Sequence, residues 1–76
     1  MFNKEIFAQR LRELRKERGL TSEGLAINVQ LTKQAISQFE NCANYPHINS
    51  LVSLADYFDV SLDYLVGRSN DPKRYR

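Results

Sequence analysis

A chain of 76 residues has room for one domain with one modest core, because a chain of this size buries only about 60% of its surface on folding, so we expect no second ligand-binding or catalytic domain. The composition, 42% hydrophobic and 26% charged, is that of a water-soluble globular domain, and no apolar run is long enough for a membrane span or a signal peptide, so we expect a cytoplasmic protein. One cysteine excludes an internal disulfide, and one histidine leaves too few ligands for structural zinc. No cofactor is expected. The net charge of +2 is weak evidence for nucleic-acid binding.

Two helices are predicted in the first 30 residues. Apolar residues at helical spacing, followed by Gly19, predict a helix over about 5–18. Thr21 is a good N-cap and precedes a second, shorter apolar stripe, which predicts a helix over 22–29.

Three more helices are predicted after a break. Thr32 is a second N-cap candidate, before a helix over 33–40. Pro46 disfavours helical geometry in the residue before it, so a loop precedes a helix over 48–58, and Ser61 caps a last short helix. No segment alternates with period two, and the predicted fold class is all-α.

The C-terminal residues differ in composition from the rest. Residues 68–76 hold four basic groups and no apolar stripe. We therefore predict a domain over residues 1–67 followed by a basic, mobile tail.

The helices predicted over 22–29 and 33–40 have the arrangement of a helix-turn-helix. Each has about two turns, too few to be stable alone, and roughly three residues join them. Their packing needs a small residue where the backbones approach, and Ala26 supplies one. Leu31 supplies the apolar residue of the turn, and Ile36 that of the second helix.

The helix predicted over 33–40 presents a polar face opposite Ile36 and Phe39. Glutamine can pair with adenine and lysine can donate to guanine, each good contact giving about 1–3 kcal/mol of discrimination. Without the helix-turn-helix motif around it, the same polar face would be explained equally well as an ordinary helix face exposed to solvent. The candidates for base contact are Lys33, Gln34, Ser37 and Gln38.

From Arg10 to Gly67, about three quarters of the chain, the sequence resembles the phage repressor and Cro-like helix-turn-helix proteins, also called the Xre family. The matching strings are RLRELRKERGLTSEGLA, LTKQAISQFEN and PHINSLVSLADYFDVSLDYLVG. The resemblance implies a five-helix, lambda-repressor-like fold whose third helix enters the major groove of double-stranded DNA, commonly as a homodimer on a pseudo-palindromic operator.

The resemblance also implies positions for other site residues. An arginine near the end of the first helix, Arg15, pairs with Glu40 and locks the recognition helix to the scaffold. Phosphate contacts are implied at helix starts and after the third helix, although capping, turn formation or plain exposure explain the same residues. These residues are Ser22, Thr32, Asn41, Asn44 and Tyr45.

The sequence departs from the family pattern in two ways. Gln30 and Cys42 stand where glycine is common, so Gln30 is expected in a left-handed conformation at a cost of roughly 1 kcal/mol. Ala43 and Asn44 stand where lysine or arginine is frequent, which predicts weaker and less salt-sensitive DNA binding. The basic tail, or two arginines of the first helix, could supply the phosphate contacts that this loop lacks. These arginines are Arg10 and Arg12.

We therefore predict a bacterial or phage transcriptional regulator, a repressor without enzymatic activity or a membrane partner. The alternative is an antitoxin or anti-repressor module that binds a protein through Ile27, Val60 or Tyr64. Thiol catalysis by Cys42 and His47 is disfavoured, since no third orienting group accompanies them.

Overall fold

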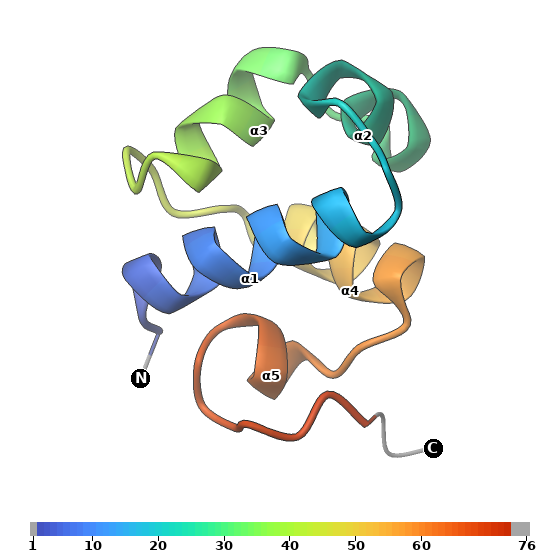
Figure 1. Cartoon of the computed structure of the whole chain (residues 1–76). Helices are drawn as coiled ribbons and strands as arrows, with labels where there is room; N and C mark the ends of the chain where they lie inside the picture. Colours follow the sequence, from blue (N-terminus) through green and yellow to red (C-terminus); the bar gives the residue numbers. More distant parts are fainter. Residues whose placement is uncertain (1, 74–76) are drawn as a thin grey trace.

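Five helices make up most of residues 2–73, the part of the chain that the computed structural model describes (Figure 1). No strand occurs among these residues, which confirms the all-α fold class, and none of their helices is long and apolar enough to cross a membrane. The first helix begins and ends one residue earlier than predicted, and the predicted bounds of the next three are correct. The helices are α1 (Lys4–Glu17), α2 (Ser22–Val29), α3 (Lys33–Glu40), α4 (Ile48–Phe58) and α5 (Leu62–Leu65).

Side-chain oxygens cap four of these helices. Each accepts a hydrogen bond from the backbone N–H three residues further along, which satisfies a donor that the first helical turn leaves without a partner. Local sequence therefore determines where these helices begin. The capping residues are Asn3, Thr21, Thr32 and Ser61.

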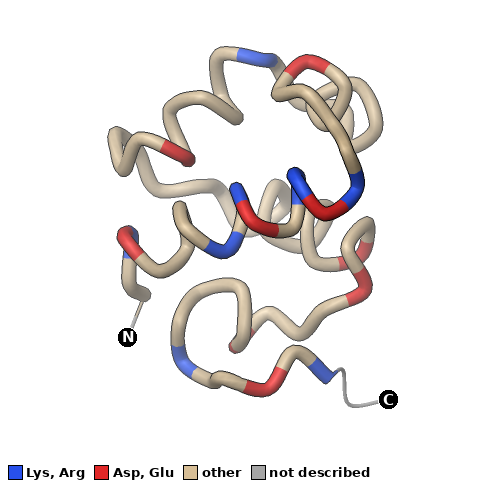
Figure 2. Tube along the Cα trace, in the orientation of Figure 1, with Lys and Arg blue, Asp and Glu red and all other residues tan. Residues whose placement is uncertain are grey.

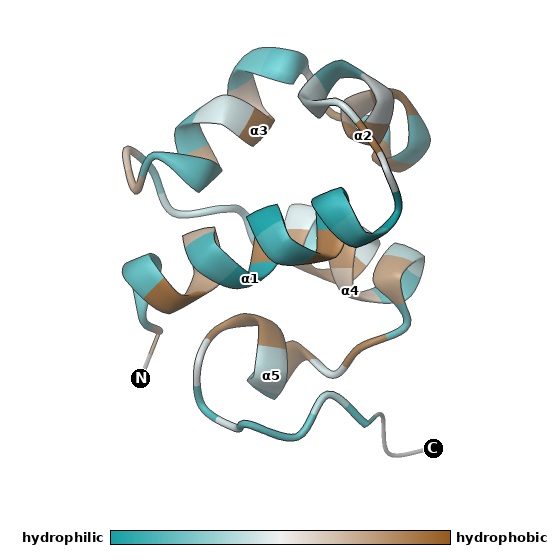
Figure 3. Ribbon diagram, in the orientation of Figure 1, coloured by the Kyte–Doolittle hydropathy of each residue, from teal (hydrophilic) through white to brown (hydrophobic). Residues whose placement is uncertain are grey.

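The core lies between the five helices, and α1 and α4 are its two longest elements. In Figure 1, α1 crosses the middle of the molecule with α3 on one side and α5 on the other, and it contacts both. In Figure 3, hydrophilic and hydrophobic residues alternate along α1 and α3, and the large apolar side chains Phe7, Leu11, Ile36 and Phe39 are buried. The largest fully buried side chains come from all five helices: Phe7, Leu11, Leu25, Ile36, Leu54 and Leu65.

Two of the departures from the family pattern have a backbone consequence. Gln30 has φ 59° and ψ 40°, so the predicted left-handed conformation is confirmed. Cys42 has φ 60°. Both residues therefore hold a conformation that glycine adopts more easily.

Residues 68–73, the first part of the predicted tail, contact α1 in the structure. The guanidinium of Arg10 donates hydrogen bonds to the carbonyl oxygen of Ser69 (2.7 Å) and to Oδ1 of Asn70 (2.8 Å), and these bonds hold the segment against α1. The remaining basic residues of the predicted tail, within 74–76, lie outside the described residues.

Candidate nucleic-acid interface

The recognition helix α3 is anchored by its apolar side. Ile36 and Phe39 are buried in the core, and α3 lies at the edge of the molecule in Figure 1. The opposite face is accessible, with three side chains exposed and the fourth half-buried. In that order, they are Lys33, Gln34, Ser37 and Gln38, the residues predicted to contact bases.

The turn between α2 and α3 forms as the motif requires. Ala26 is buried at the contact of the two helices, and its carbonyl oxygen accepts a hydrogen bond from the N–H of Leu31 (2.9 Å). Gln30, in its left-handed conformation, lies between α2 and Leu31 and redirects the chain, so that Leu31 packs against the core. The two short helices are thus held at a fixed angle by tertiary contacts.

Asn41 and Asn44, which are expected to contact phosphate, also contact side chains of the recognition face. Nδ2 of Asn44 donates a hydrogen bond to Oε1 of Gln38 (2.9 Å), and Nδ2 of Asn41 lies 3.4 Å from Oγ of Ser37. Both asparagines are exposed, so each retains polar atoms that can face a phosphate. Local sequence patterns do not predict these contacts, because the contacts depend on the path of the chain after α3.

The other phosphate candidates lie at the edge of the same helix pair. Thr32 caps α3 with its hydroxyl oxygen, and Ser22 is half-buried in the first turn of α2. Tyr45 is 62% exposed, and Nζ of Lys4 lies 4.7 Å from its ring centroid. The sequence analysis did not identify Lys4 as a cation near this site, because Lys4 and Tyr45 are far apart in the chain and no local pattern links them.

Charge is sparse on α3 and abundant on α1. Figure 2 shows most of the Lys and Arg positions along α1, whereas Lys33 is the one basic residue of α3. The interface would therefore recognise DNA with amides and hydroxyls more than with cations, in keeping with the expectation of modest salt sensitivity.

The expected pair between Arg15 and Glu40 is present. Nε of Arg15 donates to Oε2 of Glu40 (2.7 Å) and Nη2 donates to Oε1 (3.0 Å), while the Glu40 side chain is only 8% exposed. This hydrogen bonding raises the pKa of Arg15 above its ordinary value. Nη1 of Arg15 also donates to the carbonyl oxygen of Leu20 (2.9 Å), so the guanidinium joins α1, the following turn and α3.

The two arginines considered as compensating DNA ligands have internal partners. Nη2 of Arg12 donates to the backbone oxygen of Glu40 (2.8 Å), and Arg10 holds the C-terminal segment. A guanidinium that donates to backbone carbonyls has fewer donors left for phosphate.

The three apolar side chains expected to bind a protein partner differ in their exposure. Val60 is buried at 5% exposure and offers little surface to a partner, and Tyr64 is half-buried with the guanidinium of Arg10 4.1 Å from its ring centroid. Ile27 is 72% exposed. Of the three apolar groups, only Ile27 is fully available.

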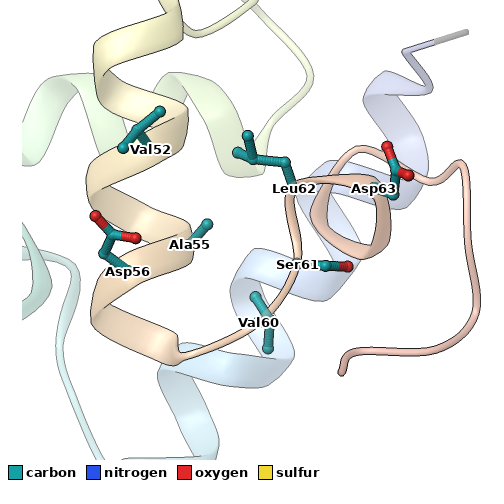
Figure 4. Close-up of a pocket in the computed structure, with 7 residues that line it drawn as sticks. All are labelled: Val52, Ala55, Asp56, Val60, Ser61, Leu62 and Asp63. Atoms are coloured by element: carbon teal, nitrogen blue, oxygen red, sulfur yellow. The ribbon is translucent and has the colours of Figure 1, made fainter. Parts of the chain in front are cut away.

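A hollow of about 360 Å³ lies between α4 and α5, away from α3 (Figure 4). Val52 and Leu62 stand on its two sides in that view. Its lining contains no residue of the helix-turn-helix, so it is not part of the candidate interface. The lining residues are Val52, Ala55, Asp56, Val60, Ser61, Leu62 and Asp63.

Known proteins share both the sequence pattern and the fold. A family model described as a helix-turn-helix domain matches residues 6–65. An uncharacterised transcriptional regulator of Bacillus subtilis, YobD, is 40% identical over 67 residues, which cover 88% of this chain. The chain spans 60% of the length of YobD and 58% of that of a second regulator of the same bacterium, YqaE.

Solved structures of DNA-binding regulators superpose closely. The P22 c2 repressor, crystallised with a synthetic operator, has a TM-score of 0.79 at 28% identity, covering 84% of this chain and 97% of the repressor chain. The restriction-modification controller protein C.AhdI of Aeromonas hydrophila has a TM-score of 0.74 at 31% identity, with coverages of 82% and 94%. Nearly the whole of each of these solved chains therefore corresponds to the fold described above.

Proposed function

The chain belongs to the helix-turn-helix domain family, in its phage repressor and Cro-like form, and we propose that it is a sequence-specific DNA-binding repressor of transcription. The observation that carries the proposal is the recognition helix α3, which is anchored by buried apolar residues and presents amide, hydroxyl and ammonium groups outward. These groups match the donors and acceptors on base edges in the major groove. The fold shared with an operator-binding repressor supports the same function.

In this proposal, base reading and positioning are divided between different residues. Lys33, Gln34, Ser37 and Gln38 contact base edges. Phosphates are contacted by exposed polar groups around α3 and by the backbone N–H groups at the starts of α2 and α3, where the helix dipole favours anions. The proposed phosphate ligands are Ser22, Thr32, Asn41, Asn44 and Tyr45, with Lys4 added by its position over Tyr45.

We further propose that the protein acts in the cytoplasm as a homodimer on DNA and represses by occupying its operator, without catalysis. A single α3 reads only a few base pairs, and two copies related by a twofold axis would double the contacted sequence. The dimer reads a pseudo-palindrome, and the spacing of its half-sites reports the distance between the two recognition helices.

Selection of bound duplexes from a random DNA pool tests the proposal. We expect enrichment of two inverted half-sites about one helical turn, roughly 10 base pairs, apart. The double variant Gln34→Ala with Gln38→Ala should lose this enrichment. A variant of the exposed Gln9 on α1, Gln9→Ala, is the matched control and should select the same sites. Failure to retain any duplex at low salt, together with copurification of a protein partner, would instead favour the antitoxin or anti-repressor alternative.

A further inference from the structure

We propose that Asn44 determines which polar group of Gln38 faces DNA, so that Gln38 reads a hydrogen-bond acceptor on a base. Asn44 is then a positioning residue for specificity, in addition to any phosphate contact. The inference rests on the proposed function, because it concerns how α3 distinguishes one base from another.

The geometry binds Gln38 at two points to the segment after α3. Its side-chain Oε1 accepts a hydrogen bond from Nδ2 of Asn44 (2.9 Å), and its backbone carbonyl oxygen accepts one from the N–H of Ala43 (2.8 Å). The left-handed Cys42 precedes both donors and turns the chain back toward α3. Gln38 is also half-buried, whereas Gln34, one turn earlier, is exposed. Gln38 is therefore the more restrained of the two glutamines.

The planar amide converts this restraint into a chemical preference. A glutamine amide has one acceptor oxygen and one donor nitrogen on opposite sides of the same plane. With Oε1 turned toward Asn44, the Nε2 donors point away from it. Guanine N7 and O6 and thymine O4 accept hydrogen bonds in the major groove, whereas the paired contact to adenine requires a donor and an acceptor together. Gln38 should thus prefer guanine or thymine, and the paired contact to adenine remains available to Gln34.

Replacing the donor at position 44 by an acceptor reverses the preference. In Asn44→Asp the carboxylate can only accept, so Gln38 must turn its Nε2 toward residue 44 and present Oε1 outward. Oε1 accepts from the amino groups of cytosine and adenine. In Asn44→Ala the amide is unrestrained, and preference at that base should become broader.

Sequence selection with purified variants tests this inference. Gln38→Ala first identifies the half-site position that Gln38 reads. At that position we expect the native chain to favour guanine or thymine, and Asn44→Asp to favour cytosine or adenine by about tenfold, the ratio that one good base contact provides. The matched control is Ala43→Asp, which places the same negative charge on the neighbouring exposed residue. It should weaken binding to all sequences through phosphate repulsion and leave the preferred base unchanged.

The possible failures can be told apart. If the native chain enriches no sequence, the proposed function fails. If the native chain enriches a site but Gln38→Ala alters no position, or Asn44→Asp retains the native base with lower affinity, then only the role assigned to Asn44 is overturned. Asn44 is exposed, so its variants should melt within a few degrees of the native chain, which separates altered recognition from altered folding.

Discussion

The guanidinium of Arg15 in α1 binds the carboxylate of Glu40 at the end of α3 through two hydrogen bonds, of 2.7 Å and 3.0 Å. A two-point contact between planar groups restrains orientation as well as distance. It therefore holds the C-terminal end of the recognition helix to the scaffold. Because the pKa of Arg15 is raised above its ordinary value, its stabilising effect is complete below the ordinary pKa and is lost only as the pH rises through the raised one, so this cation is charged at every physiological pH.

Glu40→Gln should lower the free energy of unfolding by about 2–3 kcal/mol, because it leaves a largely buried guanidinium without its counter-charge. Urea unfolding measures this change. Affinity for the selected DNA should fall as well, since the end of α3 is less restrained. Glu13→Gln, on the exposed side of α1, removes the same charge and should change the stability by less than about 0.5 kcal/mol. Equal stability and DNA affinity in native protein and Glu40→Gln would show that the pair does not lock α3.

Gln30→Gly should raise the free energy of unfolding by about 0.5–1 kcal/mol, because glycine adopts the left-handed conformation of this residue, φ 59°, without a steric penalty. The same substitution at Gln9, within α1, should lower it by about 1 kcal/mol, since glycine is unfavourable inside a helix. Opposite signs for one substitution at two exposed glutamines are the expected result of thermal and urea unfolding. A loss of stability in Gln30→Gly would indicate that its side chain stabilises the turn.

The helix bounds could be predicted because their signals are local. Thr21 and Thr32 cap the two helices of the motif within three residues of each start, and Gly19 and Pro46 lie in two of the breaks between helices. The polar face of α3 follows from the burial of Ile36 and Phe39 at helical spacing. These features depend on neighbours in the chain, so the sequence alone was sufficient.

Contacts between distant residues could not be derived from local patterns. The pairing of Arg15 with Glu40 was expected only from the family resemblance. The bond from Asn44 to Gln38 depends on the left-handed turn at Cys42, and the docking of residues 68–73 depends on hydrogen bonds to backbone carbonyl oxygens. Because every residue has a backbone carbonyl, hydrogen bonds to these groups cannot be predicted from residue types.

Arg10→Met should release the C-terminal segment. The arginine donates to the carbonyl oxygens of Tyr64 and Ser69 and to the side chain of Asn70, and methionine keeps its apolar stem but none of these bonds. We expect trypsin to cleave after Arg68 about tenfold faster, because local opening becomes easier by about 1.4 kcal/mol.

Arg18→Met is the matched control for this measurement, because Arg18, like Arg10, packs its guanidinium over an aromatic ring, but the rings it covers are those of Tyr57 and Phe58 in α4. Its cleavage rate after Arg68 should equal that of the native chain. Equal rates in all three proteins would mean that other bonds, such as the one from the N–H of Ser61 to the carbonyl oxygen of Pro72 (2.9 Å), are sufficient to hold the segment.

Gln34→Ala separates base reading from general attraction to DNA. Gln34 is exposed on α3 and uncharged, so its loss should weaken binding to the selected duplex by about 1–3 kcal/mol and leave both random-duplex affinity and the salt dependence unchanged. Lys4→Ala, which removes the cation over Tyr45, should instead weaken binding to both duplexes and reduce the salt slope by about one. Titration of both duplexes at several salt concentrations measures the two effects. Equal losses on both duplexes in Gln34→Ala would mean that α3 attracts DNA without reading this base.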